Sequence, residues 1–199
     1  MASCERILVV DGRIGGLVAA AALRRQGFAP ELVERSPEWR ATGTGLGVLA
    51  NGMRALRALA LDRAVAQAGV VMRRWRYCNA QGKVLCDTDL EALWGEVGPC
   101  IGIERGELLE ALLAGAAGVP ARLGIAVTGL TPATDRITVD FSDGSRADYD
   151  LVVGADGIHP TVRTLALGGP QPRYAGQVVW RSVIPARLSG LEGMRPAHR

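Results

Sequence analysis

The first 34 residues contain a strand–turn–helix–strand pattern, and this pattern limits the possible folds more than any other feature of the sequence. The short apolar run Ile7–Val10 predicts a buried strand, and the Ala- and Leu-rich stretch from Ile14 to Gln26 predicts a helix that Gly27 ends. Residues 31–34 follow Pro30 and predict a second strand. In a βαβ unit these two strands are parallel and adjacent. We therefore predict an α/β fold in which helices cover a parallel sheet.

The middle of the chain has a different pattern. A loop rich in Gly and Thr is predicted over Thr42–Gly47, and a helix over 53–68. Two strands, 70–78 and 83–87, are predicted on either side of Asn79–Gly82. This hairpin indicates the start of a second, antiparallel lobe.

The second half of the chain returns to alternating helices and strands. Residues 108–117 predict a helix, and four predicted strands follow it: 125–130, 137–141, 146–150 and 151–153. Asp143–Gly144 supplies a hairpin turn between the second and the third of these strands. The last strand ends in Gly154–Gly157, just before a predicted helix.

Composition and charge exclude several classes of partner. The 199 residues are 48% hydrophobic and 22% charged, which is typical of a globular chain and not of a disordered one. The net charge is only +3, and the arginines are scattered, so we expect no nucleic-acid partner and no membrane partner. The densest basic cluster, Arg73–Tyr77, alternates in the manner of an exposed strand, which we favour over a base-stacking surface.

The cysteines and the N-terminal sequence indicate the compartment. Four cysteines without a C-x-x-C pair and two histidines support neither a zinc site nor a disulfide framework, so we predict no metal. The sequence has no signal-peptide pattern and no apolar run of the roughly 18 residues that span a bilayer. We expect a cytoplasmic protein with reduced thiols.

The turn after the first predicted strand is where a dinucleotide fold binds pyrophosphate, on the free N–H groups of a helix N-terminus. The three glycine positions of the G-x-G-x-x-G fingerprint are occupied here by Asp11, Arg13 and Gly16, so one of the three glycines is kept. Glu34 follows Arg13 by 21 residues, close to the spacing of a ribose-binding acid. The alternative is a βαβ unit in which Glu34 is a solvated strand end and the turn binds nothing.

Four blocks, in this order, resemble the FAD-dependent aromatic-hydroxylase family of flavoprotein monooxygenases. They are Ile7–Ala20, Leu32–Ser36 with Gly45–Asn51, Ile103–Leu109, and Tyr149–Arg163. The last block is the most specific, because Asp156–Gly157 is similar to the family's Asp-Gly motif. The resemblance implies a Rossmann-like FAD-binding domain, a parallel sheet with helices, and the start of a smaller antiparallel substrate lobe. It assigns 1–69 and 101–170 to the FAD-binding domain, and 70–100 and 171–199 to partial substrate-lobe segments.

The resemblance also implies which residues bind the cofactor: Gly12, Arg13, Ile14, Gly15, Gly16, Glu34, Arg35, Arg105 and Asp156. By position Glu34 would bind the adenosine ribose, and Arg105 would contact the ribose or phosphate region of the flavin nucleotide, for which a guanidinium fork is suited. Asp156 would help to hold the flavin and take part in NAD(P)H binding. The structural alternative for Arg105 is a surface arginine at a helix start. The alternative for Asp156 is a helix cap, which is compatible with a binding role.

The implied activity is monooxygenation, in which NAD(P)H reduces FAD and one oxygen atom of O₂ enters a small aromatic substrate; no catalytic residue is identified. Residues 174–185 resemble the strand that enters the family's substrate sheet, whereas the family's later Gly-Asp motif has no counterpart, so we expect an incomplete chain. The alternative is a catalytically silent FAD-domain homologue that acts as an interaction module, with self-association through uncovered apolar surface. A dehydrogenase is disfavoured, because no Tyr-x-x-x-Lys pair is possible around Lys83, the single lysine.

The two replaced glycines lead to one further expectation. A carboxylate at Asp11, at about 5 Å from a phosphate and with an effective dielectric near 20, gives a repulsion of roughly 3 kcal/mol, on the order of a hundredfold in affinity. Arg13 would offset part of this by pairing with Asp11 or with phosphate, but its side chain fills space that glycine leaves open. We expect the loss to exceed the gain, so that replacing both residues by glycine tightens FAD binding at least tenfold.

Overall fold

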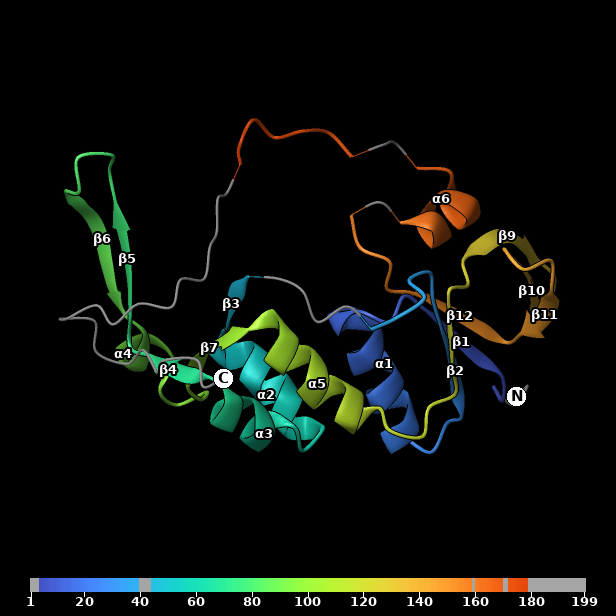
Figure 1. Cartoon of the computed structure of the whole chain (residues 1–199), viewed down its shortest axis with the longest axis horizontal. Helices are drawn as coiled ribbons and strands as arrows, with labels where there is room; N and C mark the ends of the chain where they lie inside the picture. The colour runs from blue at the N-terminus through green and yellow to red at the C-terminus, as the bar shows by residue number, and fades with distance from the viewer. Residues whose placement is uncertain (1–3, 40–43, 159, 170–171, 179–199) are drawn as a thin grey trace. The chain divides into compact units, whose positions relative to one another are not determined.

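The computed structural model describes residues 4–39, 44–158, 160–169 and 172–178, and its Cα packing divides the chain into two compact units (Figure 1). The first unit comprises residues 1–40 and 112–178. The second comprises residues 41–111, together with 179–199, which lie outside the described residues. Helix α5 (Arg105–Gly115) crosses the boundary between the units. The predicted assignment of 1–69 and 101–170 to a cofactor domain concerns function and stays a prediction.

A four-stranded parallel sheet forms the centre of the first unit. Its strands, in spatial order, are β12 (Leu151–Gly154), β1 (Ile7–Val10), β2 (Pro30–Glu34) and β8 (Ala121–Leu123). Ile7 is paired with Leu151 on one side and with Pro30 on the other. Helix α1 (Ile14–Arg25) connects β1 to β2 and packs on both strands. The predicted α/β class and the predicted parallel pairing of the first two strands are therefore confirmed.

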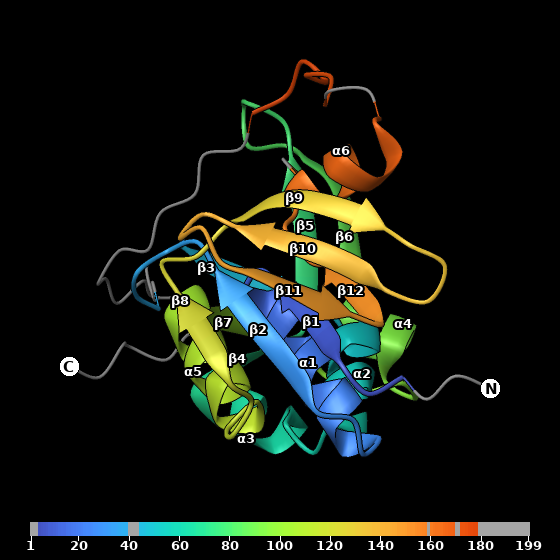
Figure 2. The same ribbon diagram turned by 90° about the vertical axis from the view of Figure 1, so that its right-hand side faces the viewer.

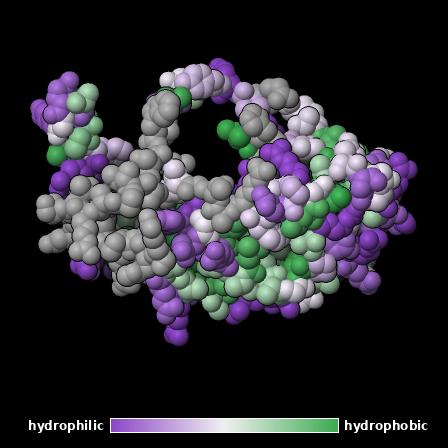
Figure 3. Space-filling view, viewed as in Figure 1, coloured by the Kyte–Doolittle hydropathy of each residue, from purple (hydrophilic) through white to green (hydrophobic). Residues whose placement is uncertain are grey.

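An antiparallel meander covers one face of this sheet. It consists of β9 (Val127–Pro132), β10 (Ile137–Phe141) and β11 (Arg146–Tyr149), with β10 in the middle (Figure 2). The shared core holds side chains from both layers: Leu8, Val10, Val33, Val127, Val139, Phe141 and Tyr149. The outer surface of the meander is mostly hydrophilic (Figure 3). The alternation of side chains along each strand thus places apolar residues between the layers and polar residues in solvent.

The second unit has an antiparallel architecture. Strand β7 (Cys100–Glu104) pairs with β3 (Gly45–Val48) on one side and with β4 (Val70–Met72) on the other. A separate hairpin contains β5 (Arg74–Cys78) and β6 (Val84–Asp89). The helices are α2 (Ala50–Ala58), α3 (Asp62–Ala68) and α4 (Leu90–Trp94). Ala50, Leu90 and Cys100 are the buried residues of a small core in this unit.

Several predicted elements have different bounds in the structure. The predicted helix 53–68 is two helices, because Ala60 adopts a left-handed conformation with φ of 59° and interrupts the helix. The described part of the predicted loop Thr42–Gly47 belongs largely to β3, since its backbone pairs with β7. The predicted strand 70–78 is divided between β4 and β5, which pair with different partners. Strands β7 and β8 and helix α4 were not predicted.

Other local predictions are confirmed. The turn Asn79–Gly82 joins β5 to β6, and the Asn79 side chain accepts hydrogen bonds from the backbone N–H groups of Gln81 and Lys83 at 3.0 and 2.9 Å. Helix α6 (Thr161–Leu167) follows the Gly154–Gly157 turn as expected. Residues 172–178 have no regular secondary structure, and the rest of the predicted strand 174–185 lies outside the described residues.

Candidate functional site

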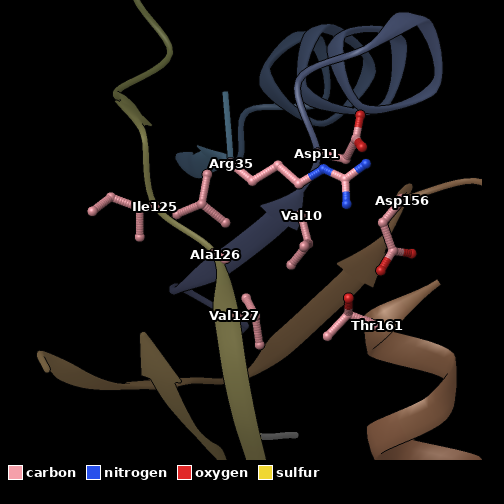
Figure 4. A pocket seen from close by; sticks show the side chains of 9 residues that line it. Val10, Asp11, Arg35, Ile125, Ala126, Val127, Asp156 and Thr161 are labelled. Atoms are coloured by element: carbon pink, nitrogen blue, oxygen red, sulfur yellow. The ribbon is translucent and has the colours of Figure 1, made fainter. Parts of the chain in front are cut away.

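The candidate site lies in the first unit at the carboxyl ends of β1, β2 and β12. A small pocket opens there, lined by residues of β1 and β2, by the segment 125–127 and by the turn that leads into α6 (Figure 4). Asp11, Arg35 and Asp156 are among its polar lining residues. Open parallel sheets bind their ligands at this edge, where strand ends and helix N-termini meet.

Glu34 ends β2 as a buried carboxylate, only 7% exposed. Its Oε2 accepts the backbone N–H of Gly12 at 2.8 Å, and its Oε1 accepts the backbone N–H of Ser36 at 2.8 Å. The side chain thus connects the turn after β1 with the segment after β2. Glu34 is not a solvated strand end; its role in binding ribose stays a prediction.

Asp11 and Arg13, which replace two fingerprint glycines, form an ion pair within the turn. The Arg13 Nε lies 3.0 and 2.9 Å from the two Asp11 carboxylate oxygens, and its terminal NH2 lies 2.6 Å from Oδ2. The backbone N–H of Arg13 also donates to Asp11 Oδ1 at 2.8 Å. Asp11 is 5% exposed and has a φ of 87°, a conformation that favours the glycine of the usual motif. The pair therefore satisfies a buried carboxylate at a backbone position that is unusual for aspartate.

Gly16, the glycine that is kept, packs directly against this turn. A Cβ at this position would lie 1.7 Å from the carbonyl oxygen of Asp11. At Gly15, in contrast, the nearest heavy atom to such a Cβ would be Ala155 Cβ at 3.9 Å. The close approach of α1 to the end of β1 thus requires glycine at position 16 and not at position 15.

Asp156 and Arg13 connect the turn after β1 with the turn after β12. The Arg13 NH2 lies 3.4 Å from the backbone oxygen of Asp156, and the Asp156 carboxylate accepts the backbone N–H of Val162 at 3.0 Å. The second contact satisfies a backbone N–H in the first turn of α6, whose N-cap residue is Pro160, so Asp156 stabilises the helix start as the structural alternative expected without being the N-cap itself. The hydrogen bond to Asp11 raises the pKa of the Arg13 guanidinium, and the charges of Glu34 and Asp156 act in the same direction.

The remaining predicted residues have different surroundings. Ile14 and Gly15 begin α1, whose N-terminus has no side-chain cap, and Arg35 lines the pocket as an exposed residue. Arg105 is the first residue of α5 and belongs to the second unit. The structure brings the other predicted residues together in the first unit, whereas a cofactor role for Arg105 stays a prediction.

Trp39 and the segment 125–127 lie at the site and were not predicted as part of it. The Trp39 ring packs on Gly12, where a Cβ would lie 2.4 Å from Trp39 Cζ3 and 3.2 Å from Glu34 Cβ. Segment 125–127 lines the pocket from about 90 residues beyond β2, and the backbone N–H of Ile125 donates to the Glu34 carbonyl at 3.0 Å. No local pattern marks either feature, because both depend on long-range packing.

The described residues contain neither a helix that could span a membrane nor a group of metal-ligand side chains. Among them, no helix combines the length and apolar character needed to cross a bilayer. Within the same part of the chain, no three His, Cys, Asp or Glu side chains are grouped as metal ligands.

Comparisons with known proteins show the family to which the chain is similar. A family model described as "FAD binding domain" matches residues 5–183. The aurachin C monooxygenase/isomerase of Stigmatella aurantiaca is 37% identical over 178 residues, which cover 89% of this chain and 46% of that protein. The 3-amino-4-hydroxybenzoate 2-monooxygenase of Streptomyces cremeus is 36% identical over 92% of this chain and 47% of its own length.

A solved structure has a similar fold over most of this chain. Klebsiella pneumoniae HpxO, complexed with FAD and uric acid, superimposes with a TM-score of 0.76 at 30% identity and covers 86% of this chain. The match covers 44% of that protein. The chain thus spans about half the length of the curated relatives it matches.

Proposed function

The chain belongs to the family of FAD binding domains, and from this we propose that it forms the FAD-binding part of a flavin-dependent monooxygenase. In this proposal NAD(P)H is the reductant and a small aromatic compound is the substrate. Cytoplasmic location and the absence of nucleic-acid and membrane partners belong to the same proposal. The resemblance inferred from the four sequence blocks is confirmed by the family match.

One observation carries the proposal: the buried Glu34 carboxylate lies beside the uncapped N-terminus of α1, at the carboxyl edge of a parallel sheet. A carboxylate at this place accepts hydrogen bonds from ribose hydroxyls, and a helix N-terminus stabilises a diphosphate. Gly15, in the first turn of α1, is not closely packed, since a Cβ there would have only Ala155 within 4 Å. These residues fit the adenosine diphosphate half of FAD.

The protein's own part in the chemistry is binding and orientation. FAD, when bound, supplies the redox chemistry and the activation of oxygen. We assign the ribose to Glu34 and the diphosphate to the first turn of α1, residues 14–16. Arg35, Asp156 and Arg105 complete the proposed set, Arg35 and Asp156 because they line the pocket and Arg105 because of its position in the family pattern.

The substrate class rests on the relatives. One of them is named for an aminohydroxybenzoate and another was crystallised with uric acid, so we propose a small aromatic substrate here. Because the chain spans about half of these relatives, hydroxylation is proposed for the protein as a whole and FAD binding for this chain. A silent homologue that self-associates through exposed apolar residues such as Ile158 and Leu167, 74% and 78% exposed, is the alternative.

Titration with FAD tests the proposal. We expect the purified chain to bind FAD, with a change in flavin fluorescence, and Glu34→Gln to weaken binding at least tenfold. Glu110→Gln, an exposed change on α5, is the matched control and leaves the affinity unchanged. A chain that binds no FAD, or binds it equally well with Glu34→Gln, would contradict the proposed site. Light scattering of the same sample decides whether the chain associates with itself.

A further inference from the structure

The ion pair between Asp11 and Arg13 occupies the two positions at which the fingerprint usually has glycine. Both residues depart from the motif, and they depart together, with opposite charges that contact each other at 2.6 Å. The Asp11 carboxylate is 5% exposed, whereas the Arg13 side chain is 47% exposed. A buried carboxylate without a partner destabilises a fold, and Arg13 is the cation that contacts this one. The two residues therefore form one structural unit.

The geometry leaves part of the Arg13 guanidinium available. Its Nε and one terminal nitrogen bond to Asp11, and that same nitrogen reaches the backbone oxygen of Asp156. A guanidinium has five N–H donors, and the second terminal nitrogen carries two of them. Among the described residues that nitrogen makes no hydrogen bond or ion pair, and the side chain is half exposed. A planar guanidinium fixed on one edge and open on the other is suited to bind phosphate oxygens.

The location of the guanidinium is equally specific. Arg13 immediately precedes α1, whose first turn has no side-chain cap. Its extended backbone, with φ of −80° and ψ of −171°, allows the side chain to fold back on Asp11. The guanidinium thus lies between the turn after β1 and the turn after β12, which is the edge proposed for the diphosphate.

We propose that Asp11 and Arg13 together replace the two missing glycines: Asp11 positions the Arg13 guanidinium, and Arg13 binds the diphosphate of the cofactor through its side chain. This inference rests on the proposed FAD site. It changes one expectation, because repulsion between Asp11 and phosphate assumed an unpaired carboxylate. The pair has no net charge, so replacing both residues by glycine leaves the affinity for a diphosphate within about threefold of the original.

Binding of ADP and of adenosine to matched variants tests the inference, because only ADP carries the diphosphate. We expect Arg13→Gly to weaken ADP binding at least tenfold, since it leaves the Asp11 carboxylate unpaired beside the phosphates. Adding Asp11→Gly to Arg13→Gly restores the affinity for ADP at least tenfold, because the unpaired carboxylate is then removed as well. Adenosine binding stays within twofold in every variant.

Two further variants make the result decisive. Arg13→Gln keeps a long side chain, removes the charge and weakens ADP binding as Arg13→Gly does, so that a folding defect of the glycine variant leaves the test intact. Arg136→Gly breaks the Asp135–Arg136 ion pair, which is exposed and lies in the loop before β10, and leaves ADP binding unchanged.

The possible outcomes separate the inference from the proposed function. If the unchanged chain binds neither FAD nor ADP, the proposed function fails and the inference fails with it. If the chain binds ADP and both Arg13 variants bind it equally well, the inference alone is overturned. It is also overturned if ADP and adenosine lose affinity in parallel, because Arg13 would then only maintain the shape of the turn.

Discussion

Replacing Tyr149 by phenylalanine tests how the meander is fixed to the parallel sheet. Tyr149 lies at the end of β11, is 1% exposed, and donates its hydroxyl to Glu31 Oε2 on β2 at 2.9 Å. The Arg6 guanidinium lies 4.9 Å from the centroid of its ring. Tyr149→Phe removes the hydroxyl and leaves the ring in place.

The expected loss follows from these contacts. A hydrogen bond to a charged acceptor contributes about 1.5–3 kcal/mol to the free energy of unfolding. The Glu31 side chain is 37% exposed and recovers part of its hydration, so the expected loss is about 1–2 kcal/mol at neutral pH. Urea unfolding followed by circular dichroism measures it. Tyr77→Phe, on the exposed hairpin where Tyr77 is 56% exposed, is the control and should leave the stability within about 0.5 kcal/mol.

The difference in stability between the unchanged chain and Tyr149→Phe should depend on pH. Burial, and then the hydrogen bond to the Glu31 carboxylate, raise the pKa of Tyr149 from 10.0 to about 12. Because the folded pKa is the higher one, the stabilisation by the neutral phenol is complete below pH 10 and is lost as the pH rises from 10 to 12. The complete linked change is about 3 kcal/mol, since the shift is about two pKa units and each unit corresponds to about 1.4 kcal/mol. The stability advantage over Tyr149→Phe should therefore disappear by about pH 12. An advantage that stays constant from pH 9 to pH 12, or no advantage at pH 7, would refute the reasoning.

Three further substitutions test other parts of the structure. Gly16→Ala should lower the free energy of unfolding by more than about 2 kcal/mol, because the new Cβ would lie 1.7 Å from the Asp11 carbonyl oxygen. Gly15→Ala is the control and should lower it by less than about 0.5 kcal/mol. Equal urea midpoints for the two variants would contradict the close approach of α1 to the end of β1. Leu8→Ala removes a fully buried side chain between the sheet and the meander and should lower the free energy of unfolding by about 2–5 kcal/mol in the same assay. A decrease below about 1 kcal/mol would show that these layers are not closely packed. Asp89→Ala should cost about 1 kcal/mol, because the Asp89 carboxylate accepts the N–H groups of Glu91 and Ala92 at 3.0 Å; unchanged hydrogen exchange over α4 would contradict this cap.

The parts of the fold that sequence predicts are those in which local pattern and packing agree. Strand β1, helix α1 and strand β2 follow directly from an apolar run, a helical stretch and a second short strand. The interruption at Ala60 could not be predicted, since Leu, Ala and Leu around it all favour helix and only tertiary packing selects the left-handed conformation. Strand β8 has three residues and depends on pairing with β2, more than 80 residues earlier.

The same distinction holds for the site. The spacing from the glycine turn to Glu34 is a property of one βαβ unit, so the sequence alone indicates it. The contact of Trp39 with Gly12 and the approach of segment 125–127 depend on how distant segments pack. The bidentate pairing of Asp11 with Arg13 could be predicted only in part. The opposite charges are visible in the sequence, but the conformation that brings the arginine side chain back to Asp11 is not.

The two hydrogen bonds to Glu34 have a consequence for the entropy of ligand binding. The N–H groups of Gly12 and Ser36 each donate to one carboxylate oxygen, and these two hydrogen bonds favour the observed rotamer before any ligand binds. Ordering a free glutamate side chain costs on the order of 1–2 kcal/mol. In this chain the side chain is ordered when the protein folds, so the ribose hydroxyl that we propose as its ligand would encounter an acceptor already fixed in position.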